Sequence, residues 1–430
     1  MPTRYDLIYY LFVPFFVPYV LFRAIVQRKY HHSAKVMLGR DLPKGEKREA
    51  LRSKGSVWMH AVSVGETVAA KAMAPLVREM LPNHPLVVTT VTETGQPHAR
   101  KILTEADHIH YFPVDLSWNV RRFQRCFNPE VFILMETELW PNFLTLAKKR
   151  GTQTFMVNGK ISERSFGRYM KVRGMLRPAF DAISAFCMQS ELDAERMRQL
   201  SGRPDDVYVT GNCKFDVPFT TLDETAAEEM RAKYKLGSSR PTVVVGSTHP
   251  GEEERMIQAF AEIREEVPDA QMILSPRHPE RFQQVFDMFR NNSHGWSVSR
   301  ASDPTLESPD VFILDTMGEL ARIYGLGNVA VVAGSFCQVG GHNLLEAAVH
   351  SVPVVVGPHM HSQKEIDRLF RGDDTGCVRT SGPELGQVLL GLLSDPDMAA
   401  RLGEQARQTA LANQGSARRS AEVIRQYLNG

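Results

Sequence analysis

Two series of short apolar segments, separated by spacers long enough for helices, constrain the fold more than any other feature of this chain. The first series comprises Val57–Ala61, Leu86–Thr90, Val131–Met135, Gln153–Val157, Ala185–Met188 and Val207–Thr210. The second comprises Thr242–Gly246, Gln271–Leu274, Val311–Leu314, Val329–Ala333 and Pro353–Gly357. Buried strands that alternate with helices are typical of βαβ units in a parallel sheet. The pattern predicts two α/β, Rossmann-like domains.

The segment between the two series, residues 217–240, has no buried-strand character and holds the acidic stretch Asp223–Glu229. It is predicted to be the inter-domain connection. The predicted boundaries are an N-terminal domain at 31–216, a C-terminal domain at 241–410 and a polar C-terminal helix at 411–430. Ligands of such folds bind at the carboxyl ends of the strands, so we expect two domains that face a central cleft.

The composition excludes several classes of protein. Hydrophobic residues make up 43% and charged residues 23%, as in a soluble globular fold. Lys and Arg number 51 against 49 Asp and Glu, and this even balance argues against a nucleic-acid partner. The five cysteines form no CxxC pair, so neither a zinc ribbon nor a disulfide framework is expected. A reducing cytosolic environment fits best.

The N-terminus has a different character from the rest. Leu7–Phe22 is an apolar run of 16 residues, shorter than the ~20 that span a bilayer, and it contains two prolines. Arg23–Lys54 then carries ten basic residues against three acids. Residues 1–30 are predicted to anchor the chain in one leaflet, with the basic flank facing anionic phospholipid on the cytoplasmic side. The alternatives are a cleaved signal peptide, which lacks a suitable cleavage site, and a buried hairpin.

Three polar clusters follow strands of the first series. His60–Glu66 contains Ser63, Gly65 and Glu66 at the expected start of a helix. A carboxylate there can act as a general base on a hydroxyl, or it can simply bond to its own helix N-terminus. Thr89–Gly95, with Thr94 and Gly95, fits either a polar ligand or a helix cap. In Met135–Asn142, Glu138 suggests a structural ion pair, while metal binding is disfavoured because no second acidic or His cluster is near.

The second series carries more specific signals. Ser275–Phe282 places Arg277 directly after a strand, where a guanidinium suits a phosphate. Asp315–Leu320 and Gly340–Glu346 open further strand-to-helix turns, and the Gly340-Gly341 pair allows backbone amides to approach an anion. Glu346 can accept hydrogen bonds from ribose hydroxyls. Neither a Walker A loop nor a GxGxxG fingerprint is present, yet three such loops in one domain favour a nucleotide site.

Taken in order, these clusters resemble the 3-deoxy-D-manno-octulosonic acid (Kdo) transferases. The motifs are HAVSVGE, TTVTETG, METELWPN, NGKISERS, GNCKFD, GSTHPGEE, PRHPERF, DTMGELA, GSF and GGHNLLE, and they extend over nearly the whole chain. The resemblance implies a two-domain GT-B glycosyltransferase that inverts the donor's anomeric centre. It also implies transfer of Kdo from CMP-Kdo to a lipid A precursor at the cytoplasmic face of the inner membrane, without a metal or other cofactor.

The resemblance also assigns roles to residues that match the family's motifs. Glu66 falls on the catalytic base. The donor-binding positions that it implies, together with their neighbours, are Pro276, Arg277, His278, Met317, Gly318, Glu319, Gly340, Gly341, Asn343 and Glu346. Positions that support the transition state or the local structure are Ser63, Gly65, Thr94, Gly95 and Glu138.

The chain departs from the family's pattern near the donor site. Lys160 stands where Arg is common, Leu344 and Ala347 replace prolines, and His361-Ser362-Gln363 replaces an Asn-Phe pair. These changes bear on affinity and on sugar preference more than on the reaction class. Two other readings remain: a GT-B enzyme with another nucleotide sugar or a related ulosonic acid as donor, and a catalytically silent membrane-associated scaffold. The intact Gly65-Glu66 pair argues against the scaffold.

Overall fold

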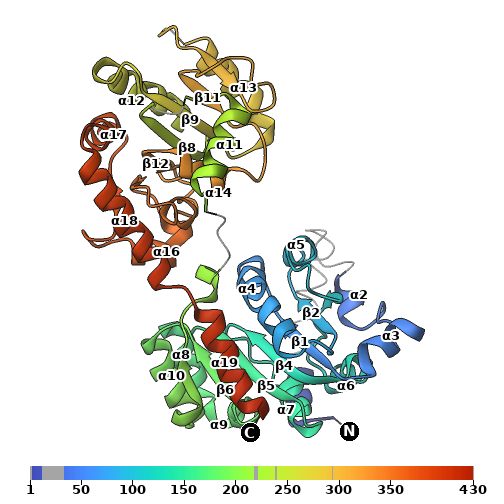
Figure 1. Ribbon diagram of the computed structural model, residues 1–430. Coiled ribbons are helices and arrows are strands. Elements are labelled where there is room, and N and C mark those ends of the chain that lie inside the picture. The colour runs from blue at the N-terminus through green and yellow to red at the C-terminus, as the bar shows by residue number, and fades with distance from the viewer. Residues whose placement is uncertain (1, 12–32, 217–220, 238–239, 293, 430) are drawn as a thin grey trace. The chain divides into compact units, whose positions relative to one another are not determined.

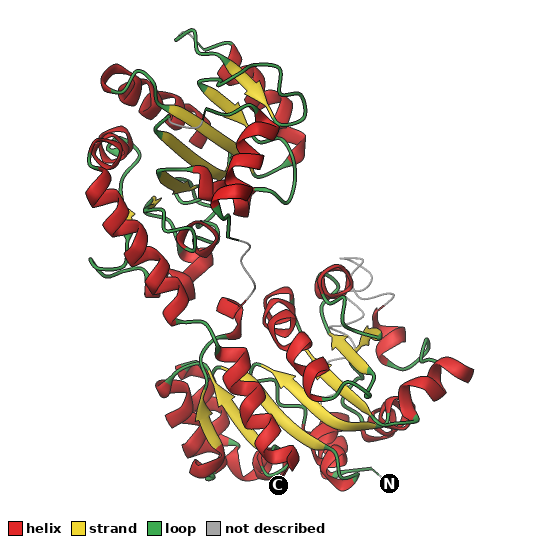
Figure 2. Ribbon diagram, in the orientation of Figure 1, coloured by secondary structure: helices red, strands yellow, loops and turns green. Residues whose placement is uncertain are grey.

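A computed structural model describes residues 2–11, 33–216, 221–237, 240–292 and 294–429. The chain forms two compact units, Met1–Val217 with Asn413–Gly430 and Pro218–Ala412, here called the N-terminal and C-terminal units. Each unit contains one seven-stranded parallel sheet covered by helices on both faces (Figures 1 and 2). The prediction of two Rossmann-like α/β domains is therefore confirmed.

The sheet of the N-terminal unit has the strand order β3-β2-β1-β4-β5-β6-β7. Its strands are β1 Ser56–His60, β2 Leu86–Thr90, β3 His108–Tyr111, β4 Pro129–Met135, β5 Gln153–Gly159, β6 Ala185–Met188 and β7 Val207–Val209. The order reverses between β1 and β4. Ligands of open α/β sheets bind outside the carboxyl ends of the strands at such a reversal.

Ten helices whose two ends lie within the described residues pack around this sheet. They are α2 Ser33–Met37, α3 Gly45–Arg52, α4 Val64–Met80, α5 Gly95–Ile102, α6 Ser117–Phe127, α7 Pro141–Lys149, α8 Glu163–Lys171, α9 Arg173–Phe180, α10 Glu191–Ser201 and α19 Ser416–Asn429. Two 3-10 turns, η1 Pro204–Asp206 and η2 Cys213–Asp216, complete the unit.

The sheet of the C-terminal unit has the order β10-β11-β9-β8-β12-β13-β14, with the reversal between β8 and β12. Its strands are β8 Thr242–Thr248, β9 Gln271–Pro276, β10 Val298–Arg300, β11 Val311–Ile313, β12 Val329–Val332, β13 Val354–Val356 and β14 Cys377–Arg379. Its helices and 3-10 turns are α11 Glu224–Tyr234, α12 Glu252–Glu266, η3 Pro279–Arg281, α13 Phe282–Arg290, α14 Leu320–Ile323, η4 Tyr324–Leu326, α15 Leu345–Ala348, η5 His361–Gln363, α16 Lys364–Leu369, α17 Leu385–Ser394 and α18 Pro396–Ala412.

Each central strand is buried on both faces, which is why it reads as a continuous apolar run. All residues of β1, β2 and β9 are buried. The two faces of the N-terminal sheet bury separate hydrophobic cores, one built around Trp58 and several phenylalanines and the other around Met59 and the alanines of α4. Each core fixes the sheet against its helices, and thereby fixes the loops at the strand ends.

The segment predicted as the inter-domain connection, residues 217–240, contains α11. This helix buries Met230 and Tyr234 in the C-terminal unit. Tyr234 packs its ring 5.2 Å from that of Phe312, a residue of β11. The helix is therefore an integral part of the C-terminal unit.

The last helix, α19, returns to the N-terminal unit. It buries Ala417, Ala421, Val423 and Ile424 in the same core as the alanines of α4. Figure 1 shows α19, in red, lying across the N-terminal sheet. The unit is thus completed by residues from both ends of the chain.

Most of the predicted anchor lies outside the described residues, because 12–32 are not described. Residues 4–11 are helical, with Tyr5 and Asp6 buried, whereas Leu7 and Leu11 are 66% and 70% exposed. Among the helices that the structure describes, none has the length and apolarity required to cross a bilayer.

Candidate active site

Glu66 lies in the first turn of α4, just past the carboxyl end of β1. Its Oε2 accepts a hydrogen bond from the backbone N–H of Val62 at 2.7 Å, and its Oε1 accepts one from the Ser63 hydroxyl at 3.0 Å. The carboxylate therefore bonds at its own helix N-terminus, as the structural interpretation of this motif expected. The same two bonds hold it in one orientation, which a general base also requires.

Burial decides the proton affinity of Glu66. The residue is only 6% exposed. Desolvation raises the pKa of its carboxyl to about 7, and the negative charges of Glu136 and Glu138 act in the same direction. The hydrogen bonds from Val62 and Ser63 oppose this shift in pKa. A carboxyl group that exchanges its proton near neutral pH suits general base catalysis in a way that an exposed glutamate does not.

His60, at the end of β1, is fully buried and cannot serve as an alternative base. Its ring is stacked on Phe112, with 3.8 Å between the ring centroids, and its Nδ1 lies 3.1 Å from the carbonyl oxygen of Thr89. Burial lowers the pKa of the imidazole to about 3. It is a neutral core residue that fixes β1 against β2.

Two further motifs meet beside Glu66. Lys214, in η2, forms an ion pair with Glu136 at 2.8 Å, and its Nζ would lie 3.6 Å from a Cβ placed on Gly65. The ion pair that was expected for Glu138 is thus formed by Glu136, whose backbone adopts a φ of +58° after β4. Burial raises the pKa of Glu138, and the charge of Glu136 adds to that effect.

The loop that follows β2 packs directly against the Glu66 loop. The backbone N–H of Thr92 donates to the carbonyl oxygen of Val62 at 3.1 Å. A Cβ on Gly95 would lie 2.7 Å from Oγ1 of Thr92 and 3.3 Å from that same oxygen. The absence of a Cβ at Gly95 therefore allows the close packing of these two loops. Thr94 precedes α5, and its side chain forms no capping bond.

The C-terminal unit contains a cavity of about 400 Å³ at the carboxyl ends of its strands. Six of the residues predicted to bind the donor line it: Pro276, Arg277, Met317, Gly318, Asn343 and Glu346. The remaining lining residues are Ser247, Ser275, Thr316, Leu320, Ala321, Tyr324, His342 and Gln363. The predicted strand-end loops therefore converge on one cavity.

The cavity brings a cation and a half-buried carboxyl group together. Glu346 accepts a hydrogen bond from Nδ2 of Asn343 at 3.4 Å. Burial raises the pKa of Glu346, while the Asn343 bond and the charge of Arg277 lower it. Arg277 is exposed and follows β9 directly. An exposed guanidinium fits a phosphate, and a half-buried carboxylate fits sugar hydroxyls, so the cavity suits a nucleotide.

Four residues of the predicted donor set do not line this cavity: His278, Glu319, Gly340 and Gly341. The amides of Gly340 and Gly341 donate to the carbonyl oxygen of Gly334 at 3.0 and 2.8 Å. The expectation that these two amides approach an anion is therefore wrong in this structure. The glycines are needed for their backbone conformation, with φ of +94° and +79°.

Glu319 holds α11 in place. Its carboxylate accepts bonds from Lys233 at 2.6 Å, from the Thr316 hydroxyl at 2.6 Å and from the Tyr234 hydroxyl at 2.5 Å. Burial alone would raise the pKa of Glu319, but these bonds outweigh it and hold the pKa at about 2. All three partners compete with any ligand for this carboxylate.

A pair of histidines beside the cavity was not among the predicted site residues. His249 and His342 approach with 2.9 Å between their Nε2 atoms, and their ring planes lie 7° apart. One ring must donate from Nε2 and the other must accept. Burial lowers the pKa of both imidazoles, that of His342 to about 4, and the charge of Arg277 acts in the same direction on each. Both residues belong to motifs of the sequence, GSTHPGEE and GGHNLLE, and these motifs were the sequence signal that could have identified them as site residues.

Glu252 ties the loops around this pair together. It is fully buried, and its carboxylate accepts backbone N–H groups of His249 at 2.9 Å, Gly334 at 2.9 Å and Phe336 at 3.0 Å. Two motifs, GSTHPGEE and GSF, are thus joined by one side chain at the reversal between β8 and β12.

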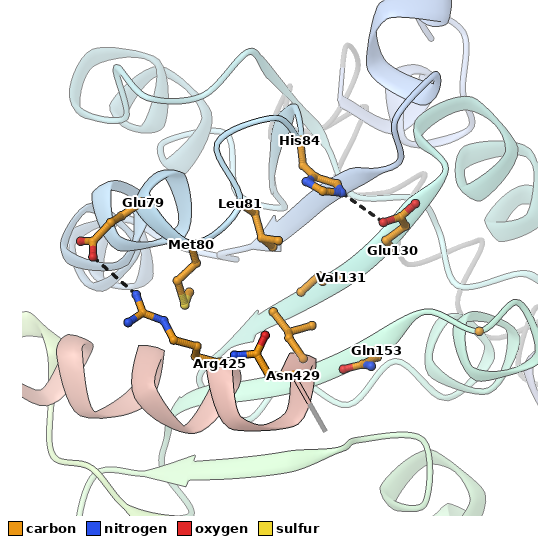
Figure 3. A pocket seen from close by; sticks show the side chains of 11 residues that line it. Glu79, Met80, Leu81, His84, Glu130, Val131, Gln153, Arg425 and Asn429 are labelled. Carbon is orange, nitrogen blue, oxygen red and sulfur yellow. Dashed lines mark hydrogen bonds and ion pairs between the residues drawn. The ribbon is translucent and has the colours of Figure 1, made fainter.

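A larger cavity, of about 690 Å³, lies at the amino ends of β4 and β5 in the N-terminal unit (Figure 3). The ion pairs Glu79–Arg425 at 3.4 Å and His84–Glu130 at 3.1 Å line it. No predicted site residue is there, and functional sites of this fold class lie at the opposite strand ends. Within the described part of the chain, no group of three or more His, Cys, Asp or Glu side chains could hold a metal ion.

Two parallel α/β units with polar residues at the carboxyl ends of their strands define a protein of the GT-B class. The UDP-GlcNAc 2-epimerase of Neisseria meningitidis shares this fold, with a TM-score of 0.55 and 12% identity over 86% of this chain and 100% of that chain. A family described as 3-deoxy-D-manno-octulosonic-acid transferase (kdotransferase) matches residues 33–217.

A curated relative agrees with that family. The 3-deoxy-D-manno-octulosonic acid transferase of Haemophilus influenzae is 31% identical over 378 residues, which are 86% of this chain and 87% of that protein. The crystallised C-terminal CMP-Kdo binding domain of WaaA from Acinetobacter baumannii is 31% identical over 43% of this chain and 96% of that chain, with a TM-score of 0.39. The chain belongs to the 3-deoxy-D-manno-octulosonic acid transferase family.

Proposed function

We propose that the protein transfers Kdo from CMP-Kdo to a hydroxyl group of a lipid A precursor, with inversion, and that Glu66 is the general base. The observation that carries the proposal is the environment of Glu66. In a member of this transferase family, a buried carboxyl with a pKa of about 7 stands at the strand reversal of the N-terminal unit.

The reaction needs one base and no covalent intermediate. Glu66 takes the proton of the acceptor hydroxyl as its oxygen attacks the anomeric carbon of Kdo. The bond from that carbon to the phosphate oxygen breaks, and its electron pair leaves with CMP. The bonds from Val62 and Ser63 hold the carboxylate in place for the proton transfer.

The 400 Å³ cavity of the C-terminal unit is the proposed CMP site. Arg277 stabilises the charge that grows on the phosphate as CMP leaves. Glu346, oriented by Asn343, accepts hydrogen bonds from the ribose hydroxyls. The proposal assigns no metal ion or further cofactor, because Arg277 supplies the charge stabilisation at this site.

The transfer itself is tested with the purified protein, a tetra-acylated lipid A precursor and CMP-Kdo generated in situ. Product mass is expected to rise by one or more Kdo units. Glu66→Gln should lower the rate by about 10²–10⁴-fold while CMP binding, measured by calorimetry, is retained. Glu195→Gln, an exposed glutamate of α10, is the matched control with unchanged rate.

The donor class is tested with the same samples. CMP should bind more tightly than UDP, and Glu346→Gln should weaken CMP binding. A folded protein that binds UDP in preference to CMP would overturn the assignment of the donor. A folded protein that binds CMP and makes no product would overturn the assignment of the acceptor.

We also propose that the N-terminus docks on the cytoplasmic face of the inner membrane and contacts its phospholipids. Two hydrogen bonds fix the helix at residues 4–11 on the N-terminal unit. The Tyr9 hydroxyl donates to the carboxylate of Asp115 at 3.0 Å, and the carboxylate of Asp6 accepts a bond from the backbone N–H of Ser117 at 2.8 Å. Its outer side exposes Leu7, Tyr10 and Leu11, and Trp118, next to Ser117, is 48% exposed. Exposed aromatic and aliphatic side chains beside a basic stretch are typical of interfacial binding.

Flotation with vesicles of phosphatidylcholine and phosphatidylglycerol tests this docking. The double variant Leu7→Ser with Leu11→Ser should float less than the wild type. Leu192→Ser is the control, because Leu192 is 56% exposed on α10, a helix outside the proposed surface. Equal flotation of all three proteins would contradict the proposal.

A further inference from the structure

A second concave site lies in the C-terminal unit, next to the proposed CMP cavity. It has a volume of about 290 Å³ and is formed by the segment after β13, by α16 and by the end of β14. Six of its lining side chains are basic or imidazole groups: His359, His361, Lys364, Arg368, Arg371 and Arg379. We call this set the basic pocket.

Among the described residues that line the basic pocket, Asp367 is the only acid, and it is 3% exposed. Its Oδ2 accepts hydrogen bonds from Nε and Nη2 of Arg371 at 2.9 and 2.6 Å. Its Oδ1 accepts one from Nη2 of Arg379 at 2.5 Å. A single buried carboxylate therefore orients two guanidinium groups from two different elements toward one pocket.

The charge of Asp367 is engaged in two ion pairs, with Arg371 and Arg379, but the pocket carries a net positive charge. Counting Lys364, Arg368, Arg371 and Arg379 against Asp367, and the histidines as neutral, gives 4 − 1 = +3. Within the described residues, neither Lys364 nor Arg368 has an acidic group within ion-pair distance. Like charges confined in a small concave site repel one another unless an anion neutralises them.

We propose that the basic pocket binds a phosphate monoester or another doubly charged tetrahedral anion. Guanidinium groups offer pairs of N–H donors that match phosphate oxygens, and Lys364 adds a mobile point charge. The site is distinct from the CMP cavity. The two sites share no lining residue, although the 3-10 turn η5 contributes Gln363 to the CMP cavity and His361 to the basic pocket. The inference does not depend on the identity of the donor or the acceptor.

The test is a calorimetric titration of the full-length protein with inorganic phosphate, in the presence and absence of saturating CMP. The double variant Lys364→Gln with Arg368→Gln removes two cations and leaves the Asp367 bonds intact. The charge-matched control is Arg290→Gln with Arg401→Gln, two exposed arginines of α13 and α18. Phosphate should bind to the wild type and the control, and the pocket variant should lose about tenfold or more in affinity.

Two outcomes would overturn the proposal. One is the absence of phosphate binding to the wild type at concentrations of about 1 mM and above. The other is an equal loss of affinity in the control, which would show a non-specific effect of net charge. Phosphate binding that CMP abolishes, and that the pocket variant retains, would place the anion in the CMP cavity instead.

A vesicle arm separates the two sources of such an anion. Vesicles of phosphatidylcholine with phosphatidic acid present a phosphate monoester on a lipid surface. Weaker flotation of the pocket variant than of the control would assign the pocket to a lipid headgroup. Equal flotation, together with the calorimetric loss, would assign it to a soluble phosphate compound.

Discussion

At the scale of single residues, the position of a residue in the sequence and its surroundings in the folded structure give different information about its role. The sequence places Glu66 at the start of a helix that follows a strand, and that pattern fits both a bond to the helix N-terminus and a base. In the structure, its carboxylate accepts hydrogen bonds from the two residues that precede the helix and is also buried beside two other acids. The two roles are compatible, because the bonds that fix the start of the helix also orient the base.

The pH dependence of the reaction follows from this environment. The pKa of Glu66 is raised from 4.5 to about 7, and a base must be unprotonated to act. The rate constant kcat/KM should therefore rise with pH, with a midpoint near 7, and fall about tenfold per pH unit well below it. The measurement is a pH–rate profile with CMP-Kdo at low concentration.

Glu138→Gln tests the electrostatic part of that shift. The charge of Glu138 raises the pKa of Glu66, so its removal should move the acidic limb of the profile to lower pH. Glu195→Gln on α10 should leave the limb where it is. A limb that stays in place or moves to higher pH in Glu138→Gln would contradict the assignment of Glu66 as the titrating base.

At the scale of elements, the strands that the sequence did not predict share one property. β3, β10 and β14 all lie at the edges of their sheets. β3 reads His-Ile-His-Tyr and β14 reads Cys-Val-Arg, without the apolar run of a strand buried on both faces. An edge strand has one neighbour and is less covered, so fewer of its residues need to be apolar.

Two helical glycines differ in what surrounds them, and this gives a prediction about stability. Gly391 in α17 has no atom within 4 Å of the position a Cβ would take, whereas a Cβ on Gly403 in α18 would overlap the main-chain oxygen of Ser351. Gly391→Ala should stabilise the C-terminal unit by about 0.5–1 kcal/mol, because alanine loses less backbone entropy in a helix. Gly403→Ala should destabilise it.

Native-state hydrogen exchange of the β12 and β13 amides measures both effects in the intact protein. The two variants carry the same chemical change in neighbouring helices, so each is the control for the other. Similar changes in exchange for both would mean that α18 does not pack on the Ser351 turn as described.

At the scale of the whole molecule, the N-terminal unit is assembled from two segments that are distant in the sequence, whereas the C-terminal unit is one continuous segment. The helix α19 follows the entire C-terminal unit in the chain yet lies in a core of the N-terminal unit. The apolar positions of α19 predict an amphipathic helix, but they do not say which unit it covers.

Truncation of one side chain in α19 tests this arrangement. Ile424 is fully buried, and Ile424→Ala should destabilise the N-terminal unit by about 2–5 kcal/mol. Glu422→Ala, at an exposed position of the same helix, should have little effect. Faster exchange of the β1 and β4 amides is expected in Ile424→Ala, with the C-terminal strands unchanged. The reverse pattern would place α19 in the other unit.

The sequence by itself determined two parallel sheets and the loops that carry chemistry, because apolar runs and strand-end motifs are local patterns. Six of the ten residues predicted to bind the donor share one cavity, since the carboxyl ends of parallel strands meet at one edge. Only the tertiary structure decided which of the predicted donor-binding groups remain available to a ligand. Glu319 is occupied by α11, and the amides of Gly340 and Gly341 are occupied by Gly334. Hydrogen-bond partners are chosen by packing between distant segments, which spacing along the chain does not encode.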